Sequence, residues 1–332
     1  MNKKLIWTAA LILAAGCGSV DPDEPGALVP GTVDDDASLP YVEINGTRLH
    51  ATTFGDSANP MIVVLHGGPG ADYRSLLPLR VLADDGYYVI FWDQRGAGLS
   101  RRHDASDITL EAYRDDLRLL IDHYTSSANQ PIAFIGHSWG AMYATMFVNE
   151  FGDLDGRIRG AVLSEPGAFT KKQLDAYFER LFGSVAFVGE QLNDMTWSGQ
   201  FITAREHARA DYLGMVQSAG GFPAEHHDPD NPSPQFRMGA IAQKRLLAIA
   251  ERDGFDWTTN LGGFTTKVLF LRGSLNEAMP LSHQMELASS YPDAEVVTIE
   301  GVGHDMIWER TDEYLNYVRQ YFAAIGFGGG IQ

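Results

Sequence analysis

Residues 131–148 read PIAFI-GHSWG-AMYATMFV: an apolar run, a serine between two glycines, and a helical pattern. The apolar run predicts a buried strand, and the pattern after residue 140 predicts a helix. The G-x-S-x-G segment between them predicts a sharp, strained turn that lifts the hydroxyl of Ser138 above the edge of a sheet. Gly136 and Gly140 suit this turn because a Cβ at either place would crowd the crossing of strand and helix. We therefore predict that Ser138 is a nucleophile rather than a structural turn residue.

Alternating strand and helix patterns continue on both sides of this segment. Asn45-Gly46 lies between two strand-like segments and predicts a β-hairpin. Further strand patterns lie at 61–65, 87–92, 158–164, 267–271 and 295–299, with helices over 110–124 and near the C-terminus. This alternation predicts an α/β fold with a mostly parallel, eight-stranded sheet covered by helices on both faces.

The alternation stops between about residues 166 and 262. This stretch is helical and aromatic, has a Pro/Asp-rich loop at 222–234, and contains no run that resembles a central strand. We expect it to be a helical cap inserted after the sixth strand, where it would exclude water and shape the substrate pocket. Residues 39–165 and 263–326 would then form the core domain.

The bulk composition limits the classes of partner. The 332 residues are 45% hydrophobic, which suffices for one large domain with a sizeable core, or for a core with an inserted subdomain. The net charge of −18 argues against nucleic acid and anionic membrane surfaces as partners, because both are polyanions.

The N-terminus resembles a bacterial lipoprotein signal. A basic region at 2–4 precedes an apolar run at 5–15 that is too short to span a bilayer. The run leads to Cys17, the only cysteine, so we expect residues 1–17 to be a signal peptide with a lipobox and Cys17 to be lipidated. A lipid on Cys17 would anchor the exported protein to a membrane without a spanning helix. Residues 18–38 are acidic and rich in Pro and Gly, which predicts a flexible tether, and we expect the tail at 326–330 to be disordered.

A serine nucleophile needs a base and donors for the oxyanion. His304 follows the last expected strand in Gly301-Val302-Gly303-His304, where a base is expected in this chain order. Trp139 supplies one backbone N–H at the start of its helix, and Gly68 in the 66–70 glycine loop is the best candidate for the second. His226 and His227 lack a third ligand at a familiar spacing, so we interpret them as solvated loop residues and expect neither a metal nor a cofactor.

Three motifs together resemble the proline iminopeptidase family of α/β-hydrolases. They are His66-Gly67-Gly68-Pro69-Gly70, Asp93-Gln94-Arg95-Gly96-Ala97-Gly98-Leu99-Ser100 and Gly136-His137-Ser138-Trp139-Gly140, and the segment 304–309 is similar to that family's histidine segment. The resemblance implies an α/β-hydrolase fold and a metal-free serine triad that removes N-terminal residues, often proline, from peptides. It also implies that Asp93 and Arg95 brace the loops around the site.

The third triad member departs from the family pattern. The family expects Asp after the seventh strand, but that position holds Asn276, followed by Glu277. An amide orients an imidazole but cannot balance the charge of an imidazolium. Three possibilities stay open: Glu277 is the acid, Asn276 serves a weak or inactive site, or the acid is Glu165 at the end of the sixth strand. The Glu165 location is similar to that of the acid in one group of haloalkane dehalogenases, and a glutamate ending a buried strand needs a partner. We favour Glu165.

The leading expectation is a cell-envelope serine hydrolase, an aminopeptidase acting on short peptides or aminoacyl amides. Glu277, Glu190 and Glu206 are candidates to bind the substrate ammonium. The alternative is a carboxylesterase or lactonase that uses the same catalytic residues. The second alternative is a catalytically weak surface lipoprotein that binds its ligand.

Overall fold

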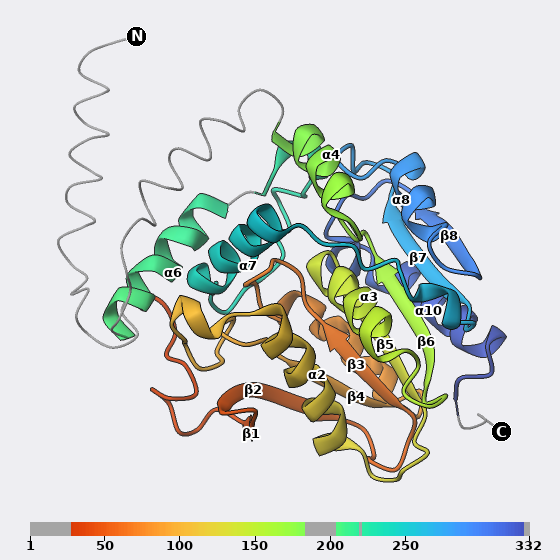
Figure 1. Ribbon diagram of the computed structural model, residues 1–332, viewed down its shortest axis with the longest axis horizontal. Coiled ribbons are helices and arrows are strands. Elements are labelled where there is room, and N and C mark those ends of the chain that lie inside the picture. Colours follow the sequence, from red (N-terminus) through yellow and green to blue (C-terminus); the bar gives the residue numbers. More distant parts are fainter. Residues whose placement is uncertain (1–27, 183–203, 219–220, 329–332) are drawn as a thin grey trace.

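Eight strands form one sheet in the order β1-β2-β4-β3-β5-β6-β7-β8 (Figure 1). The computed structural model describes residues 28–182, 204–218 and 221–328. The first two strand pairs of this order, β1 with β2 and β2 with β4, are antiparallel, and all the others are parallel. The predicted mostly parallel, eight-stranded sheet is therefore confirmed. The strands are β1 (Tyr41–Ile44), β2 (Thr47–Phe54), β3 (Met61–Leu65), β4 (Tyr88–Trp92), β5 (Ile132–His137), β6 (Ile158–Ser164), β7 (Val268–Gly273) and β8 (Ala294–Ile299).

The hairpin between β1 and β2 has the predicted two-residue turn. Ile44 pairs with Thr47, so Asn45 and Gly46 alone connect the strands. Their φ values of 47° and 70° are the left-handed values that this type of turn requires and that Asn and Gly tolerate.

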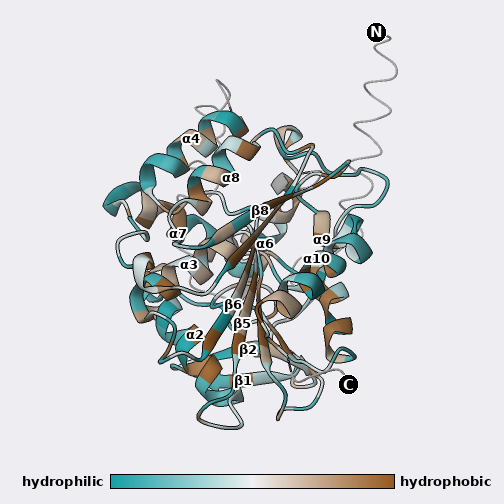
Figure 2. Cartoon of the chain, turned by 90° about the vertical axis from the view of Figure 1, so that its right-hand side faces the viewer, coloured by the Kyte–Doolittle hydropathy of each residue, from teal (hydrophilic) through white to brown (hydrophobic). Residues whose placement is uncertain are grey.

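The sheet is packed on both faces because the side chains of its central strands alternate between two cores. In β3, Met61, Val63 and Leu65 join the core on one face, and Ile62 and Val64 join the core on the other. Helices α2 and α3 cover the first face and α10 covers the second (Figure 2). The 3₁₀ helix η1 also packs on the second face. The covering helices are η1 (Arg74–Ala83), α2 (Leu110–Tyr124), α3 (Trp139–Phe151), α8 (Leu281–Ala288), α9 (Met306–Glu309) and α10 (Thr311–Ala324), with short 3₁₀ turns η2 (Ala105–Asp107) and η5 (Leu261–Gly263). Within the described ranges, no helix is both long and apolar enough to cross a bilayer.

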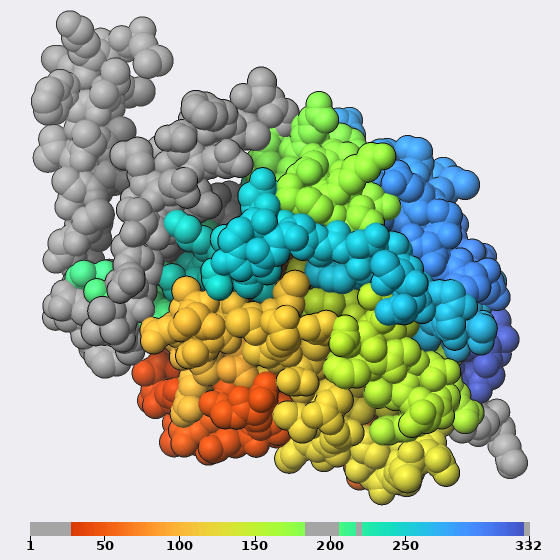
Figure 3. Space-filling model, viewed as in Figure 1, coloured from red at the N-terminus to blue at the C-terminus, as the bar shows by residue number. Residues whose placement is uncertain are grey.

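A helical cap follows β6, as predicted. Its described part comprises α4 (Lys171–Phe182), α6 (Ala204–Ser218), the 3₁₀ turn η4 (Pro223–Glu225) and α7 (Ala240–Asp253), before the chain returns to the sheet at β7, and residues 183–203 and 219–220 of the expected cap lie outside the described residues. In the space-filling view, a cyan band formed by α7 and the segment after it crosses the molecule between the N-terminal part of the core and α4 (Figure 3). At its start the Gly239 N–H donates to the Gly70 carbonyl at 2.6 Å, which joins the cap to the glycine loop.

Residues 28–38, which we call the N-terminal strap, differ from the expected tether. Val29 and Val33 are buried, and the Val33 N–H donates to the Leu99 carbonyl at 2.8 Å. Asp34 pairs with Arg101 at 2.7 Å. The strap is therefore packed on the core, while residues 18–27 of the expected tether lie outside the described residues.

Residues 326–328 also differ from the expected disordered tail, whose residues 329 and 330 lie outside the described residues. The ring of Phe327 is buried and stacks on Tyr87, with ring centroids 5.6 Å apart. The Tyr87 hydroxyl donates to the Phe327 carbonyl at 2.8 Å. This aromatic pair makes residue 327 part of the folded core rather than of a disordered tail.

Candidate active site

Ser138 occupies a strained turn between β5 and α3. Its φ of 56° and ψ of −120° are rare for a residue with a Cβ, and the side chain is half-buried. The Ser138 N–H donates to the Ser164 carbonyl at 2.8 Å, which ties the turn to β6. A Cβ on Gly140 would lie 2.0 Å from the Leu65 carbonyl oxygen, and one on Gly136 would lie 2.6 Å from the Gly140 oxygen. Both glycines are thus required by the close crossing of strand and helix.

Glu165 lies directly behind His304. The Nδ1 of His304 donates to Oε2 of Glu165 at 2.6 Å, and Glu165 has no solvent exposure. Two further donors complete this carboxylate: the Asn276 side-chain amide reaches Oε2 at 2.7 Å, and the Gly273 N–H reaches Oε1 at 2.8 Å. Three donors on one buried carboxylate compensate the cost of removing its charge from water.

Asn276, at the position where the resemblance expects an acid, contacts the carboxylate and not the imidazole. Its amide donates to Glu165, and its Oδ1 accepts the Met279 N–H at 3.0 Å. The adjacent Glu277 has an exposed side chain, and its N–H donates to the Ala224 carbonyl at 2.7 Å. Of the three open possibilities, the geometry brings only Glu165 to His304.

The ring of His304 lies beside the serine turn. It packs on the ring of His137, with centroids 4.5 Å apart, and the His137 Nε2–H donates to the His304 carbonyl at 2.8 Å. Because Nδ1 is committed to Glu165, Nε2 is the nitrogen left to accept a proton. The described residues include no hydrogen bond between the Ser138 hydroxyl and His304, a contact that often tightens only when substrate binds.

A cluster of charged groups that we did not predict surrounds His304. His227 donates through Nδ1 to Asp305 at 2.7 Å and lies 3.4 Å through Nε2 from the Glu225 carboxylate. The expectation that His227 is a solvated loop residue was therefore wrong, because these two acids hold it against the core. His226, by contrast, has an exposed side chain.

These charges control the protonation of the cluster. Burial lowers the pKa of His304, but the charge of Glu225 and the hydrogen bond to Glu165 outweigh burial and raise this pKa to about 9. Burial likewise lowers the pKa of His227, yet its bonds to Asp305 and Glu225 raise it to about 10. His227 is therefore a cation at neutral pH. Buried His137 has the opposite behaviour, because burial and the neighbouring His304 charge lower its pKa to about 4.

The two expected oxyanion donors lie at the start of α3 and in the glycine loop that passes Ser138. Trp139 is the first residue of α3, so its N–H has no partner within the helix. Gly68 has a φ of 117°, which favours glycine, and no hydrogen bond from its N–H to another group occurs among the described residues. A Cβ on the adjacent Gly67 would lie 3.2 Å from the Ser138 Cβ, so the glycine loop passes directly beside the serine.

His66 and Gln94 fix the glycine loop. The Gln94 N–H donates to His66 Nε2 at 3.0 Å, and the Gln94 side-chain amide donates to the His66 carbonyl at 2.9 Å. The indole N–H of Trp139 donates to the Gln94 side-chain oxygen at 2.9 Å. One glutamine thus links both halves of the expected oxyanion hole.

Asp93 and Arg95 have the bracing positions that the resemblance implies. The Asp93 carboxylate accepts the N–H groups of Tyr73 at 3.1 Å and of Leu99 at 2.8 Å. Arg95 forms a bidentate pair with the buried Asp116 at 2.7 Å through both contacts. Both residues hold loops together and do not contact His304.

Of the remaining candidates, only Glu206 lies within the described residues. Glu206 is half-buried on α6, and both Glu190 and Cys17 lie outside the described residues. In the parts of the chain that the structure describes, no group of three or more His, Cys, Asp or Glu side chains is arranged to hold a metal ion.

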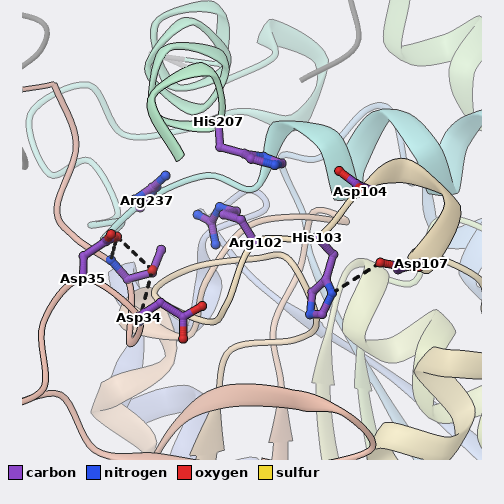
Figure 4. Close-up of a pocket in the computed structure, with 9 residues that line it drawn as sticks. Asp34, Asp35, Arg102, His103, Asp104, Asp107, His207 and Arg237 are labelled. Atoms are coloured by element: carbon purple, nitrogen blue, oxygen red, sulfur yellow. Dashed lines mark hydrogen bonds and ion pairs between the residues drawn. The ribbon is translucent and has the colours of Figure 1, made fainter. Parts of the chain in front are cut away.

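A pocket of about 300 Å³ lies elsewhere, between the N-terminal strap, the loop before α2 and the cap (Figure 4). The two arginines that line it, Arg102 and Arg237, both pair with the buried Asp211, at 2.9 and 2.7 Å, so part of their charge is balanced within the protein. Ser138 and His304 are not among its lining residues, so it is not the candidate active site. Its walls are formed by Thr32, Asp34, Asp35, Arg102, His103, Asp104, Asp107, His207 and Arg237.

The comparisons with known proteins agree with the observed fold. Residues 60–311 match the model of the alpha/beta hydrolase fold family. The chain belongs to this α/β-hydrolase family. The proline iminopeptidase PfmaB of Pestalotiopsis fici is 26% identical over 294 residues, covering 85% of this chain and 98% of its own length. The proline iminopeptidase of Saccharolobus solfataricus is 25% identical over 299 residues, covering 85% of this chain and 91% of its own.

The solved structures show the same fold. An esterase from Exiguobacterium antarcticum superposes with a TM-score of 0.56 at 17% identity, covering 88% of this α/β-hydrolase and 98% of its own chain. At that identity the likeness concerns the fold alone. The resemblance to the proline iminopeptidase family of α/β-hydrolases is therefore supported by sequence relatives along most of the chain.

Proposed function

We propose that this α/β-hydrolase is a serine hydrolase with Ser138, His304 and Glu165 as its triad. The observation that carries the proposal is the 2.6 Å contact from His304 Nδ1 to Glu165, on the ring that packs beside the serine turn. A carboxylate at this place stabilises the imidazolium that forms when His304 takes the serine proton. The same contact supports an enzyme over a binding protein that has lost its acid.

The reaction then follows the acyl-enzyme route. Ser138 Oγ attacks the substrate carbonyl carbon while its proton passes to His304 Nε2, and the N–H groups of Gly68 and Trp139 stabilise the oxyanion. His304 returns the proton to the leaving amine or alcohol as the acyl bond breaks. A water molecule, activated by His304, then hydrolyses the acyl-enzyme and frees Ser138.

We further propose that the substrates are short peptides or aminoacyl amides. Two relatives that cover 85% of the chain are proline iminopeptidases, which supports an aminopeptidase. Such an enzyme needs a carboxylate for the substrate ammonium, and Glu277, Glu206 and Glu190 are the candidates. A carboxylesterase or lactonase is the second candidate, favoured by the exposed side chain of Glu277, because an ester substrate needs no ammonium site.

The decisive experiment compares substrate classes on one preparation. We expect hydrolysis of proline and alanine β-naphthylamides to exceed that of p-nitrophenyl esters in kcat/KM. Ester turnover without aminoacyl-amide turnover would contradict the proposed peptidase activity and support the esterase. A fluorophosphonate probe should label the protein, and Ser138→Ala should abolish labelling. Absence of labelling in the unaltered protein would instead favour a non-catalytic binding protein.

We also propose that the protein is an envelope lipoprotein anchored through Cys17. The basic and apolar N-terminal residues and the single cysteine support this proposal. Expressed in a bacterium, the full chain should be recovered in the membrane fraction, and Cys17→Ser should move it to the soluble fraction. Equal soluble recovery of both proteins would contradict the anchor.

A further inference from the structure

The cap meets the catalytic loops at one short segment, residues 223–228, which we call the cap turn. The His304 N–H donates to the Glu225 carbonyl at 3.0 Å and to the His226 carbonyl at 3.3 Å. The approach is so close that a Cβ on Gly303 would lie 1.8 Å from the His226 oxygen. The cap turn therefore bonds directly to the backbone of the base.

The cap turn also bonds to the neighbouring loops. The Ala224 carbonyl accepts the N–H of Ala278 at 3.0 Å, in the loop that carries Asn276. The Asp228 N–H donates to the carboxylate of Glu309 at 2.9 Å, beyond His304 in the chain. These contacts tie the loops after β7 and β8 to one piece of the cap.

Two charged side chains of the cap turn, Glu225 and His227, form a row with Asp305 near the imidazole of His304. Glu225 is only 5% exposed and accepts the Tyr177 hydroxyl, from α4 of the cap, at 2.6 Å. His227 lies between Glu225 and Asp305, and its ring centroid is 6.2 Å from that of His304. The row places an anion, a cation and a second anion near the imidazole of His304.

We propose that Glu225 and His227 are positioning residues: the cap turn fixes the backbone of His304, and the opposing charges of these two side chains set its affinity for the proton. The proposal rests on the proposed function, because it assigns this role only if His304 is the base. The position and the proton affinity of the triad histidine then depend on where the cap turn lies.

The two charges act in opposite directions. Anionic Glu225 favours the imidazolium of His304, whereas cationic His227 disfavours it. The other groups that face His304 are the acids Glu165, after β6, and Asp305, beside it in the chain, and His137 of β5. His137 is neutral at pH 7, because burial and the charge of His304 lower its pKa to about 4.

The test is the pH dependence of fluorophosphonate labelling of the full chain. Labelling requires neutral His304, so the second-order rate constant of labelling rises with pH to a plateau. The midpoint of this rise lies at the pKa of the His304 ring. Glu225→Gln should move the midpoint to lower pH by on the order of one unit, and His227→Gln should move it to higher pH. Glu286→Gln is the matched control, because Glu286 accepts a bond from Gln173 of α4 at 3.1 Å and so joins cap and core away from His304. This control should leave the midpoint unchanged.

A purely structural role would change the melting temperature or the maximal rate without moving the midpoints in opposite directions. Shifts of the same sign, or no shift in folded variants, would therefore overturn the inference. If Glu225→Gln does not fold, the direction of the His227→Gln shift decides. A protein that is never labelled at any pH would instead refute the proposed function, so the two failures are distinguishable.

Discussion

Glu165 has an unusual backbone conformation, and both oxygens of its carboxylate accept hydrogen bonds. Its φ of 45° lies in the left-handed region, which costs of order 1 kcal/mol or more for a residue with a side chain. Three hydrogen bonds to its carboxylate, from His304, Asn276 and Gly273, hold it there. Strain held by a polar network at the end of a strand is typical of a functional position.

The acid can be tested with a pair of amide substitutions. Glu165→Gln should lower kcat by about 10⁴-fold, the loss known when a triad acid becomes an amide. Glu277→Gln should retain the rate of fluorophosphonate labelling, because its exposed side chain does not contact His304. Measuring kcat and the rate of fluorophosphonate labelling for both variants at one pH decides whether Glu165 or Glu277 is the acid. If Glu165→Gln keeps full turnover, the proposed triad is wrong.

Single residues were predictable to different degrees. Ser138 and His304 follow from motifs that lie next to strand ends in the sequence. The acid stayed open because the choice among Glu165, Asn276 and Glu277 depends on how the ends of β6 and β7 meet in space. Glu225 and His227 lie in a Pro/Asp-rich loop with no periodicity, so no local pattern indicated that they approach the base.

At the scale of elements, the strap shows how composition can mislead. Its Asp, Pro and Gly content predicts a tether, but two valines at 29 and 33 give it an apolar contact with the core. Asp34 also lies close to two arginines, Arg101 at 2.7 Å and Arg48 at 3.3 Å. A few apolar side chains at the right spacing outweighed the polar average.

The strap should therefore contribute to stability. Val33 is 3% exposed, so Val33→Asp removes a buried side chain and introduces a charge, which should destabilise the fold by about 2 kcal/mol or more. Ala37→Asp introduces the same charge at an exposed position of the strap and should leave the melting temperature unchanged. Thermal unfolding of both variants is the measurement, and equal melting temperatures would show that the strap does not stabilise the core.

The regular elements were otherwise predicted closely. Strand β6 and helix α2 begin and end where the apolar patterns do, and β4 starts one residue later than expected. These patterns are strong because the central strands are buried on both faces and read as continuous apolar runs. Contacts between cap and core were not predictable, since they join segments far apart in the sequence.

At the scale of the molecule, the sheet gathers the site at one edge. Ser138, Glu165, Asn276 and His304 follow strands β5, β6, β7 and β8, which are successive neighbours in the sheet. In a parallel sheet such residues meet at the carboxyl edge, which is why alternation of strands and helices sufficed to predict that they converge. The sequence does not reveal which of them touch.

The amide of Asn276, bonded to the same Glu165 oxygen as His304, limits how such a site can change during evolution. A carboxylate at both places would bring two like charges together, and one would have to keep a proton. The two positions therefore complement each other, with an amide at one strand end and the acid at the next. Moving the acid from the end of one strand to the end of the next therefore requires substitutions at both positions. An intermediate with a carboxylate at each position carries an electrostatic penalty.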